Sequence, residues 1–281
     1  MDYTRYIWAW RHGEAMRTTS EMSRVRPAAV AGAFYPGNPG RLGAKVSELL
    51  AGVPGPIGAA KALIAPHAGY VYSGQVAASA FAALRSQAET IERVVLIGPA
   101  HYVRLRGLAV PTVAAFETPL GRVPVDQEAL AALADLPFVS EADDPHAPEH
   151  ALEVELPFLQ LVLSSFALVP LVVGDTTPNE VAEVLARLWG GAETLLVVSS
   201  DLSHYHPYGE ARRLDAETAA AIERSDSAAL SPARACGFLP IAGLLVEAGR
   251  RGLAARRLAL CNSGDTAGDR ARVVGYGAWA F

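Results

Sequence analysis

Short apolar runs alternate with Ala- and Leu-rich stretches of helical periodicity along most of this chain. Apolar runs of about four to eight residues are typical of strands that are buried on both faces of a sheet. They predict strands at Ala62–Ala65, Val94–Ile97, Leu168–Val173, Leu195–Val198 and Val273–Tyr276. The stretches between them predict helices over residues 40–52, 74–87, 126–135, 149–164, 178–189, 210–224 and 237–250. Strands that alternate with helices indicate a three-layer α/β/α sandwich whose sheet is at least partly parallel.

The regular pattern begins at Arg26. Residues 1–25 show neither a helical nor a strand period, and we expect a flexible N-terminal tail there because untethered termini are usually poorly ordered. No stretch rich in Pro, Gly or Ser divides the remainder, and no repeat of fixed period is present. We therefore predict a single domain over residues 26–281.

Composition narrows the class of protein. Hydrophobic residues make up 51% of the 281 residues and charged residues 19%, which permits a sizeable core and excludes wholesale disorder. The formal net charge is −5 and no basic stripe is present, which argues against a nucleic-acid partner. Two cysteines are too few for a disulfide-stapled scaffold, and no apolar run approaches the ~20 residues of a membrane span. We expect a soluble, cytoplasmic protein.

Polar residues gather where three of the predicted strands end. The first strand is followed by Pro-His, the second by Gly-Pro-Ala-His and the fourth by Ser-Ser-Asp-Leu-Ser-His-Tyr-His, which places His67, His101, Asp201, His204 and His206 there. Ligands of open α/β sheets lie beyond the carboxyl ends of the strands, so parallel neighbouring strands would bring these residues into one crevice. A lone histidine is more often an ordinary loop residue, but the recurrence favours function for His67 and His101. For His206, structural packing is an equal alternative.

Two imidazoles suit a transition metal, and a third, anionic donor would complete such a site. Cys236 is the leading candidate, because it precedes a predicted helix with Pro240 in its first turn, where a thiolate is favoured. A small buried core residue is the equal alternative for Cys236. Cys261 follows an apolar run that resembles the end of another buried strand, and we expect it to pack in the core.

A third group of candidates lies around Pro148, which we expect to open a helix. Glu149 and Glu153 would then share one helix face, with His150 close to Glu153. A His–Glu pair can move protons or orient a metal ligand, whereas acidic residues at a helix N-terminus are also ordinary partners of the helix dipole. His146, just upstream among Asp and Pro residues, is expected to be a loop residue.

Several common motifs are missing. The sequence has no G-x-x-x-x-G-K-[ST] loop, no G-x-G-x-x-G after a strand, no H-E-x-x-H and no G-x-S-x-G. The glycines of Gly32–Gly40 do not have phosphate-loop spacing and instead predict a turn followed by a helix that is capped by Asn38. Kinase, P-loop and serine-hydrolase functions are thereby disfavoured.

Seven short motifs occur in a fixed order along the chain. They are Ala31–Pro36, Pro66–Tyr70, Gly98–His101, Glu149–Glu153, Ser199–His204, Cys236-Gly237 with Pro240-Ile241, and Asn262–Asp265. On these motifs the chain resembles the Memo family, which is labelled AmmeMemoRadiSam system protein B in prokaryotes. The resemblance extends from about Arg26 to Phe281.

The resemblance implies a mostly parallel mixed sheet, similar to the catalytic subunit of class III extradiol dioxygenases. In those relatives two histidines and a glutamate bind Fe(II). The two histidines correspond to His67 and His101, and Cys236 stands where the glutamate would be. Fe(II) is the expected metal, although a His₂Cys set is softer and also suits copper or zinc. The resemblance further implies an AMMECR-type protein and a radical SAM protein as partners.

Our main hypothesis from the sequence is a non-haem metalloenzyme with His67, His101 and Cys236 as ligands. Asp201, His204 and His150 would line the pocket as acid–base or substrate-positioning groups for oxidation of a small, aromatic substrate. A scaffold protein that binds a partner in the crevice without catalysis is one alternative. A metal-dependent hydrolase that uses bound water as its nucleophile is the other.

Overall fold

The structure of the protein, a computed structural model, describes residues 24–53, 55 and 58–281. Its centre is a nine-stranded mixed sheet in the order β10-β12-β2-β9-β3-β8-β4-β7, with β11 paired to β12. Strands β2, β9, β3 and β8 are parallel to one another and form the buried middle of the sheet. The strands of this sheet are β2 (Ala62–Ala65), β3 (Arg93–Pro99), β4 (Leu108–Val110), β7 (Val139–Glu141), β8 (Ala167–Val173), β9 (Thr194–Ser199), β10 (His204–His206), β11 (Arg256–Asn262) and β12 (Val273–Ala280).

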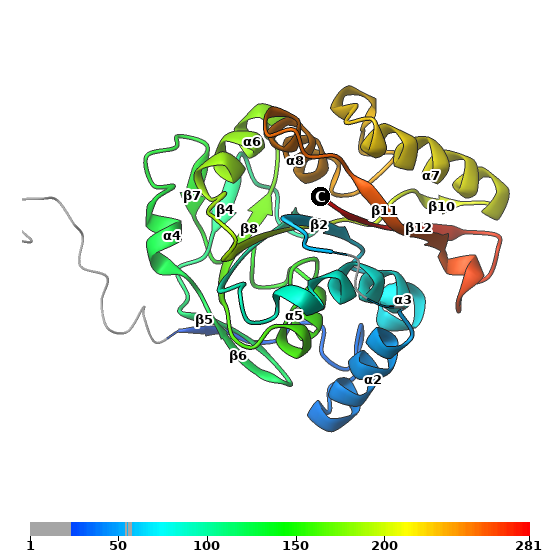
Figure 1. The fold of residues 1–281 in the computed structure, drawn as a ribbon, viewed down its shortest axis with the longest axis horizontal. Helices are drawn as coiled ribbons and strands as arrows, with labels where there is room; N and C mark the ends of the chain where they lie inside the picture. The colour runs from blue at the N-terminus through cyan, green and yellow to red at the C-terminus, as the bar shows by residue number, and fades with distance from the viewer. Residues whose placement is uncertain (1–23, 54, 56–57) are drawn as a thin grey trace, which may run out of the picture.

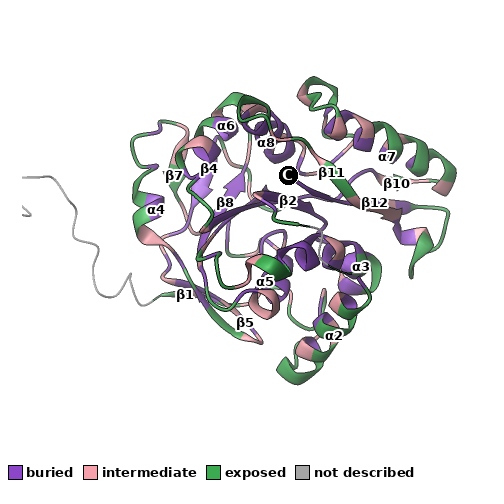
Figure 2. Ribbon diagram, in the orientation of Figure 1, coloured by how far each residue is buried: buried purple, intermediate pink, exposed green. Residues whose placement is uncertain are grey.

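Helices cover both faces of this sheet (Figure 1). One face carries α2 (Pro39–Ala51), α3 (Tyr70–Phe81) and α5 (Leu156–Val162), which contact one another. The other face carries α6 (Pro178–Arg187), α7 (Tyr208–Glu223) and α8 (Phe238–Arg250). Figure 2 shows the sheet buried between helices whose outer faces are exposed. The predicted three-layer α/β/α fold with a mixed sheet is confirmed.

The remaining elements are short. A second sheet joins β1 (Val25–Arg26), β5 (Ala115–Thr118) and β6 (Gly121–Pro124) in the order β1-β5-β6. Helix α4 spans Gln127–Ala131, and single 3₁₀ turns are η1 (Ala82–Gln87), η2 (Glu153–Glu155), η3 (Ser227–Ala229) and η4 (Ser263–Asp265). Within the described residues, no helix combines the length and the apolar character needed to cross a bilayer.

Local sequence explains several of the element boundaries. Helix α2 begins as expected, with the Asn38 side chain accepting a hydrogen bond from the Arg41 amide and Pro39 in the first position. Helix α6 begins at a capping box formed by Thr177 and Glu180. Helix α3 starts at Tyr70, four residues before its predicted start, and gives way to η1 after Phe81.

The helix predicted over residues 149–164 is wrong in its first part. Residues 149–152 are irregular, η2 follows, and α5 begins only at Leu156. The Glu149 carboxylate accepts a hydrogen bond from the Ala151 amide, a local interaction that competes with a helix. Pro157 lacks an amide donor and therefore belongs in the first turn of α5 rather than in a helix interior. Glu149 and Glu153 consequently do not share one helix face.

The predicted N-terminal tail lies almost wholly outside the described residues. Of its last two residues, Val25 belongs to β1 and pairs in parallel with Ala115 of β5. Arg26, the next residue, is 4% exposed and enters the core.

A buried ion pair attaches this N-terminal strand to the domain. The Arg26 guanidinium contacts the Glu153 carboxylate, which is fully buried, and also donates a 2.5 Å hydrogen bond to the Glu149 carbonyl oxygen. The Glu153 carboxylate accepts further hydrogen bonds from the Ala29 and Val30 amides and from the Tyr35 hydroxyl. This network joins the segment after β1 to η2, beside the segment that carries Glu149 and His150.

We expect Arg26→Met to lower the free energy of unfolding by about 3–5 kcal/mol, because it leaves the buried Glu153 charge without its cation. Urea unfolding followed by circular dichroism measures the loss. Lys45→Met is the matched control, since the Lys45–Glu48 pair is largely exposed and should contribute less than about 1 kcal/mol. Equal effects of the two substitutions would contradict this prediction.

Candidate metal centre

The three strands that end in polar residues are neighbours. Strand β9 lies between β2 and β3 and is parallel to both, so the carboxyl ends of all three lie at the same edge of the sheet. His67 follows β2, Asp201 follows β9 and His101 follows β3, each two residues beyond the strand. The expected convergence of these residues is therefore observed.

The side chains of His67, His101 and Cys236 meet at this edge. One ligand atom from each, a ring nitrogen or the sulfur, lies within 4.8 Å of the others. Cys236 Sγ is 3.4 Å from His67 Nε2, and the two imidazole centroids are 5.2 Å apart. Each bond from a shared ion to such donors is about 2.0–2.3 Å long, so small side-chain movements suffice to bring the three donors around one cation. The donor set fits a metal ion, and the ligand role itself stays a prediction.

Cys236 reaches the cluster from the turn before α8. Its amide donates to the Asp201 carbonyl at 3.3 Å, and its sulfur accepts from the Asp201 amide at 3.2 Å, which fixes the turn against the end of β9. Gly237 follows because a Cβ at that position would lie 2.7–2.8 Å from atoms of Ser199 and Ser200. Burial raises the pKa of the Cys236 thiol to about 12, so the metal-free thiol is protonated at neutral pH.

His67 is buried and held in one orientation. Its Nδ1 lies 2.7 Å from Ser199 Oγ, and the Ser199 hydroxyl donates to the Ala151 carbonyl at 2.6 Å. Because that serine proton is used, the Nδ1–H of His67 donates to Ser199 and the Nε2 lone pair faces Cys236. Burial, with the nearby histidines adding to it, holds the pKa of His67 well below its ordinary 6.5. A neutral imidazole is the form that binds a metal.

His101 is oriented by Glu149. The Glu149 carboxylate accepts from the His101 amide at 2.6 Å and lies 2.8 Å from His101 Nδ1. This leaves Nε2 of His101 for the cluster with His67 and Cys236. Burial raises the pKa of Glu149, but the hydrogen bonds from His101 outweigh it and hold that pKa below its ordinary value. An ionised carboxylate behind a ligand histidine raises the basicity of the imidazole and fixes its tautomer.

The three predicted acid–base residues line one pocket with the two histidines. The pocket has a volume of about 790 Å³, and Asp201, His204 and His150 lie in its wall together with His67 and His101. Burial raises the pKa of Asp201 to about 7, whereas burial lowers the pKa of His150 to about 4. His204 Nδ1 lies 2.8 Å from the Leu202 carbonyl, which leaves its Nε2 free to act in the pocket.

Aromatic side chains form much of the remaining wall of this pocket. Phe34, Tyr72, Tyr205 and Tyr276 line it, and Tyr205 is 61% exposed. Tyr205 also has a positive φ of 62°, a strained conformation for a non-glycine residue that often accompanies functional sites. The Arg272 guanidinium lies 5.0 Å from the Tyr205 ring centroid. The wall therefore presents aromatic rings beside the histidines and Asp201.

Two other histidines lie away from the cluster. His206 Nδ1 is 3.3 Å from Glu210 on the surface, and His206 does not line the pocket. His146 is buried, with Nε2 3.0 Å from the Ala109 carbonyl, and packs against Phe116. Neither residue belongs to the cluster of His67, His101 and Cys236.

Sequence reasoning missed two residues behind the cluster. Ser199, the last residue of β9, contacts His67, and Glu155 lies 3.1 Å from Ser199 Oγ. Burial raises the pKa of Glu155 well above its ordinary value, so this carboxyl group is neutral. The strand-end position was a usable signal for Ser199. No comparable signal marks Glu155 in the sequence, because acidic residues near the start of a helix are common.

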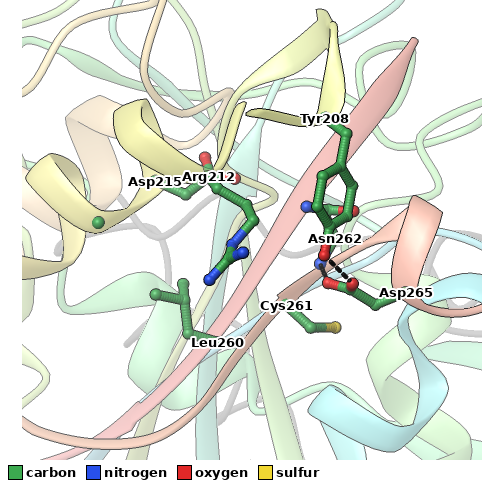
Figure 3. Close-up of a pocket in the computed structure, with 8 residues that line it drawn as sticks. Tyr208, Arg212, Asp215, Leu260, Cys261, Asn262 and Asp265 are labelled. Atoms are coloured by element: carbon green, nitrogen blue, oxygen red, sulfur yellow. Dashed lines mark hydrogen bonds between the residues drawn. The ribbon is translucent and has the colours of Figure 1, made fainter. Parts of the chain in front are cut away.

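Cys261 packs against the hydrophobic core, as expected, although it is not fully buried. It is half-buried on β11 and lines a separate pocket of about 310 Å³ (Figure 3). Its burial is incomplete because β11 pairs only with β12 within the described sheet and its inner residues are half-buried. Burial raises the pKa of the Cys261 thiol to about 11. Tyr208, in the same pocket, donates a 2.6 Å hydrogen bond to Asp265.

Comparison with known proteins identifies the family of this chain. The family model for Memo-like proteins matches residues 26–280. A MEMO1 family protein of Aquifex aeolicus is 37% identical over 267 residues, covering 90% of this chain and 97% of the relative. A MEMO1 family protein of Archaeoglobus fulgidus is 36% identical, covering 92% of this chain and 99% of the relative.

A solved structure supports the fold independently. The uncharacterized protein JW3007 from Escherichia coli K12 superposes with a TM-score of 0.54 at 16% identity, covering 79% of this chain and 99% of that chain. The molecule is an α/β protein with a histidine-lined pocket and a His/His/Cys cluster at the carboxyl edge of its sheet. This chain belongs to the Memo family, as its motifs indicated.

We expect Glu149→Gln to weaken metal binding about 10–100-fold, because the amide cannot supply the negative charge behind His101. Isothermal titration with Zn²⁺ measures the affinity. Glu210→Gln is the matched control, since Glu210 faces His206 outside the cluster and its loss should leave the affinity unchanged. Unchanged affinity in Glu149→Gln would refute a role for Glu149 in orienting His101.

Asp215, in the pocket of Cys261, predicts a pH dependence of stability. It is buried, accepts from the Ser203 amide at 3.0 Å, and burial raises its pKa from 3.8 to about 6. The folded state therefore holds the carboxyl proton of Asp215 more tightly than the unfolded state does. The resulting contribution to the free energy of unfolding is present below pH 3.8 and is lost as pH rises to about 6. We expect the stability of the protein relative to Asp215→Asn to fall by about 2–3 kcal/mol over this window. Urea unfolding at pH 4 to 7 measures the difference, and parallel curves for the two proteins would show the prediction to be wrong.

Proposed function

We propose that this protein is a metal-dependent enzyme that oxidises a small aromatic molecule at the His67–His101–Cys236 cluster. The observation that supports this proposal most is the position of the cluster. Two of the three donors lie in the wall of an aromatic-lined pocket that also contains Asp201, His204 and His150. Donors for a metal, acid–base groups and room for a flat substrate thus occur together.

The metal that we propose is Fe(II), which on binding would supply open positions and redox chemistry for O₂ and substrate. Two imidazoles and a thiolate also accept copper or zinc, and the metal analysis below distinguishes these ions. Cys236 in place of a carboxylate makes the site softer than that of the extradiol dioxygenases.

The chain's own side chains supply the proton chemistry. Asp201, with a pKa near 7, accepts a proton from a phenolic substrate when ionised and holds it when neutral. His150 and His204 have pKa values below the ordinary 6.5 and are neutral at pH 7, so each can accept a hydrogen bond or a proton. Tyr72 and Tyr205 cover the substrate ring and reduce its contact with water.

We expect the anaerobically purified protein to carry about one iron per chain. In His67→Ala and Cys236→Ser we expect the affinity for Fe(II) to be at least about tenfold weaker. Elemental analysis and a titration with Fe(II) measure both quantities. Cys261→Ser is the matched control, because Cys261 lies in its separate pocket and should not affect metal content. Equal metal content in the parent, His67→Ala and Cys236→Ser would show that the cluster is not the metal site.

The activity is tested with the iron-loaded protein. Uptake of O₂ in the presence of catechol-type phenols supports the proposed oxidation, and an EPR spectrum of the nitric oxide complex that changes on adding the phenol supports direct binding at the metal. Turnover without O₂ would favour a metal-assisted hydrolase instead. Partner binding that survives His67→Ala/His101→Ala, with no turnover, would favour the scaffold function. The AMMECR-type and radical SAM partners stay predictions.

A further inference from the structure

A second pocket, of about 510 Å³, is lined in part by Cys236. It lies beyond the carboxyl ends of β3 and β8 and is separate from the pocket that His67 and His101 line. Its lining includes Cys236, the first turn of α8 at residues 238–240, and the residues Arg104, Arg106 and Asp175. Cys236 therefore borders a pocket other than the one that the two histidines line.

The loop that carries the two arginines is fixed to the loop after β8. The Gly107 amide donates to the Asp175 carbonyl at 2.8 Å, and the Asp175 amide donates to the Leu105 carbonyl at 2.8 Å. A Cβ at Gly174 would lie 2.1 Å from the Leu105 oxygen, so the two backbones are in close contact. Leu105 packs against the core, whereas the residues on either side of it are exposed. The position of the two arginines along the pocket is thus set by the fold.

The two guanidinium groups are not used in the domain. Within the described part of the chain, the side chains of Arg104 and Arg106 make neither a hydrogen bond nor an ion pair, whereas Arg93 and Arg187 on the same domain each contact a carboxylate. Asp175 is the one carboxylate among the described residues of this lining, against two guanidinium groups. A guanidinium group matches the geometry of carboxylate and phosphate oxygens, and the neighbouring apolar turn of α8 strengthens such an interaction by lowering the local dielectric.

We propose that this pocket binds a small molecule with a carboxylate or phosphate group, held by Arg104 and Arg106 beside the Cys236 sulfur. The ligand would occupy a place distinct from that of the aromatic substrate, so two molecules can approach the centre at once. The inference depends only on the metal-free pocket and does not require the proposed oxidation.

The test uses the two cysteines as reporters in the same molecule. Metal-free protein is alkylated with iodoacetate, which carries a carboxylate, or with neutral iodoacetamide, and mass spectrometry gives the rate at each cysteine. The ratio of the two rates does not depend on the thiol pKa, because both reagents react with the same thiolate. We expect the ratio of the iodoacetate rate to the iodoacetamide rate at Cys236 to be about three- to tenfold lower in Arg104→Gln/Arg106→Gln than in the parent. High salt should reduce this difference between the two proteins.

The matched control is Arg212→Gln, since Arg212 lines the pocket of Cys261. It should leave the Cys236 ratio unchanged. At constant ionic strength, inorganic phosphate or acetate should slow alkylation of Cys236 in the parent and not in the double variant. The anion that slows alkylation more strongly is the preferred oxyanion. An unchanged Cys236 ratio in the double variant would overturn the proposal, as would equal protection of the parent and the variant.

A second measurement applies if Cys236 reacts with neither reagent. ¹⁵N-labelled parent protein titrated with inorganic phosphate or acetate should show saturable shifts of the amides in residues 104–107, and Arg104→Gln/Arg106→Gln should not. Identical shifts in the two proteins, or no shifts in the parent with either anion, would refute the pocket as an oxyanion site.

Discussion

The parallel pairing of β9 with both β2 and β3 is the constraint on which the rest of the site depends. Parallel strands present their carboxyl ends at one edge, and every chemical group of the candidate centre follows one of these ends or is hydrogen-bonded to one. Cys236 is no exception, although it comes from the turn before α8, because two hydrogen bonds tie it to Asp201 at the end of β9. A different strand order would scatter the same residues around the molecule.

Burial then decides the charge of each group. His67 is neutral, the Cys236 thiol is protonated in the metal-free chain, and Glu155 is a neutral acid behind Ser199. Glu149 alone of these keeps its charge, because His101 donates to it. One anion behind a set of neutral donors suits a cation between them, since the ion would replace the thiol proton and complete the charge balance.

The site is also linked to the N-terminal strand. Arg26 of β1 contacts Glu153 and the Glu149 carbonyl, so the segment that supplies Glu149 and His150 is held by a residue more than a hundred positions earlier in the sequence. This segment was expected to be helical and is irregular instead. The Arg26 guanidinium satisfies the Glu149 carbonyl oxygen, which a helix would otherwise have paired.

The sequence by itself determined the fold class, the middle strands and the identity of the paired histidines. Continuous apolar runs can only be buried between two layers, and a histidine directly after such a run must lie at the edge of the sheet. It could not decide between a ligand and a core residue at Cys236, nor reveal the position of Glu155 or that Arg104 and Arg106 line one pocket with Cys236. These features depend on which segments, far apart in the chain, lie close together in the folded protein. The residue type at one position does not specify its neighbours in space. Short strands such as β4 and the edge strand β7 escaped prediction for the same reason, since pairing with a neighbour rather than local pattern makes them strands.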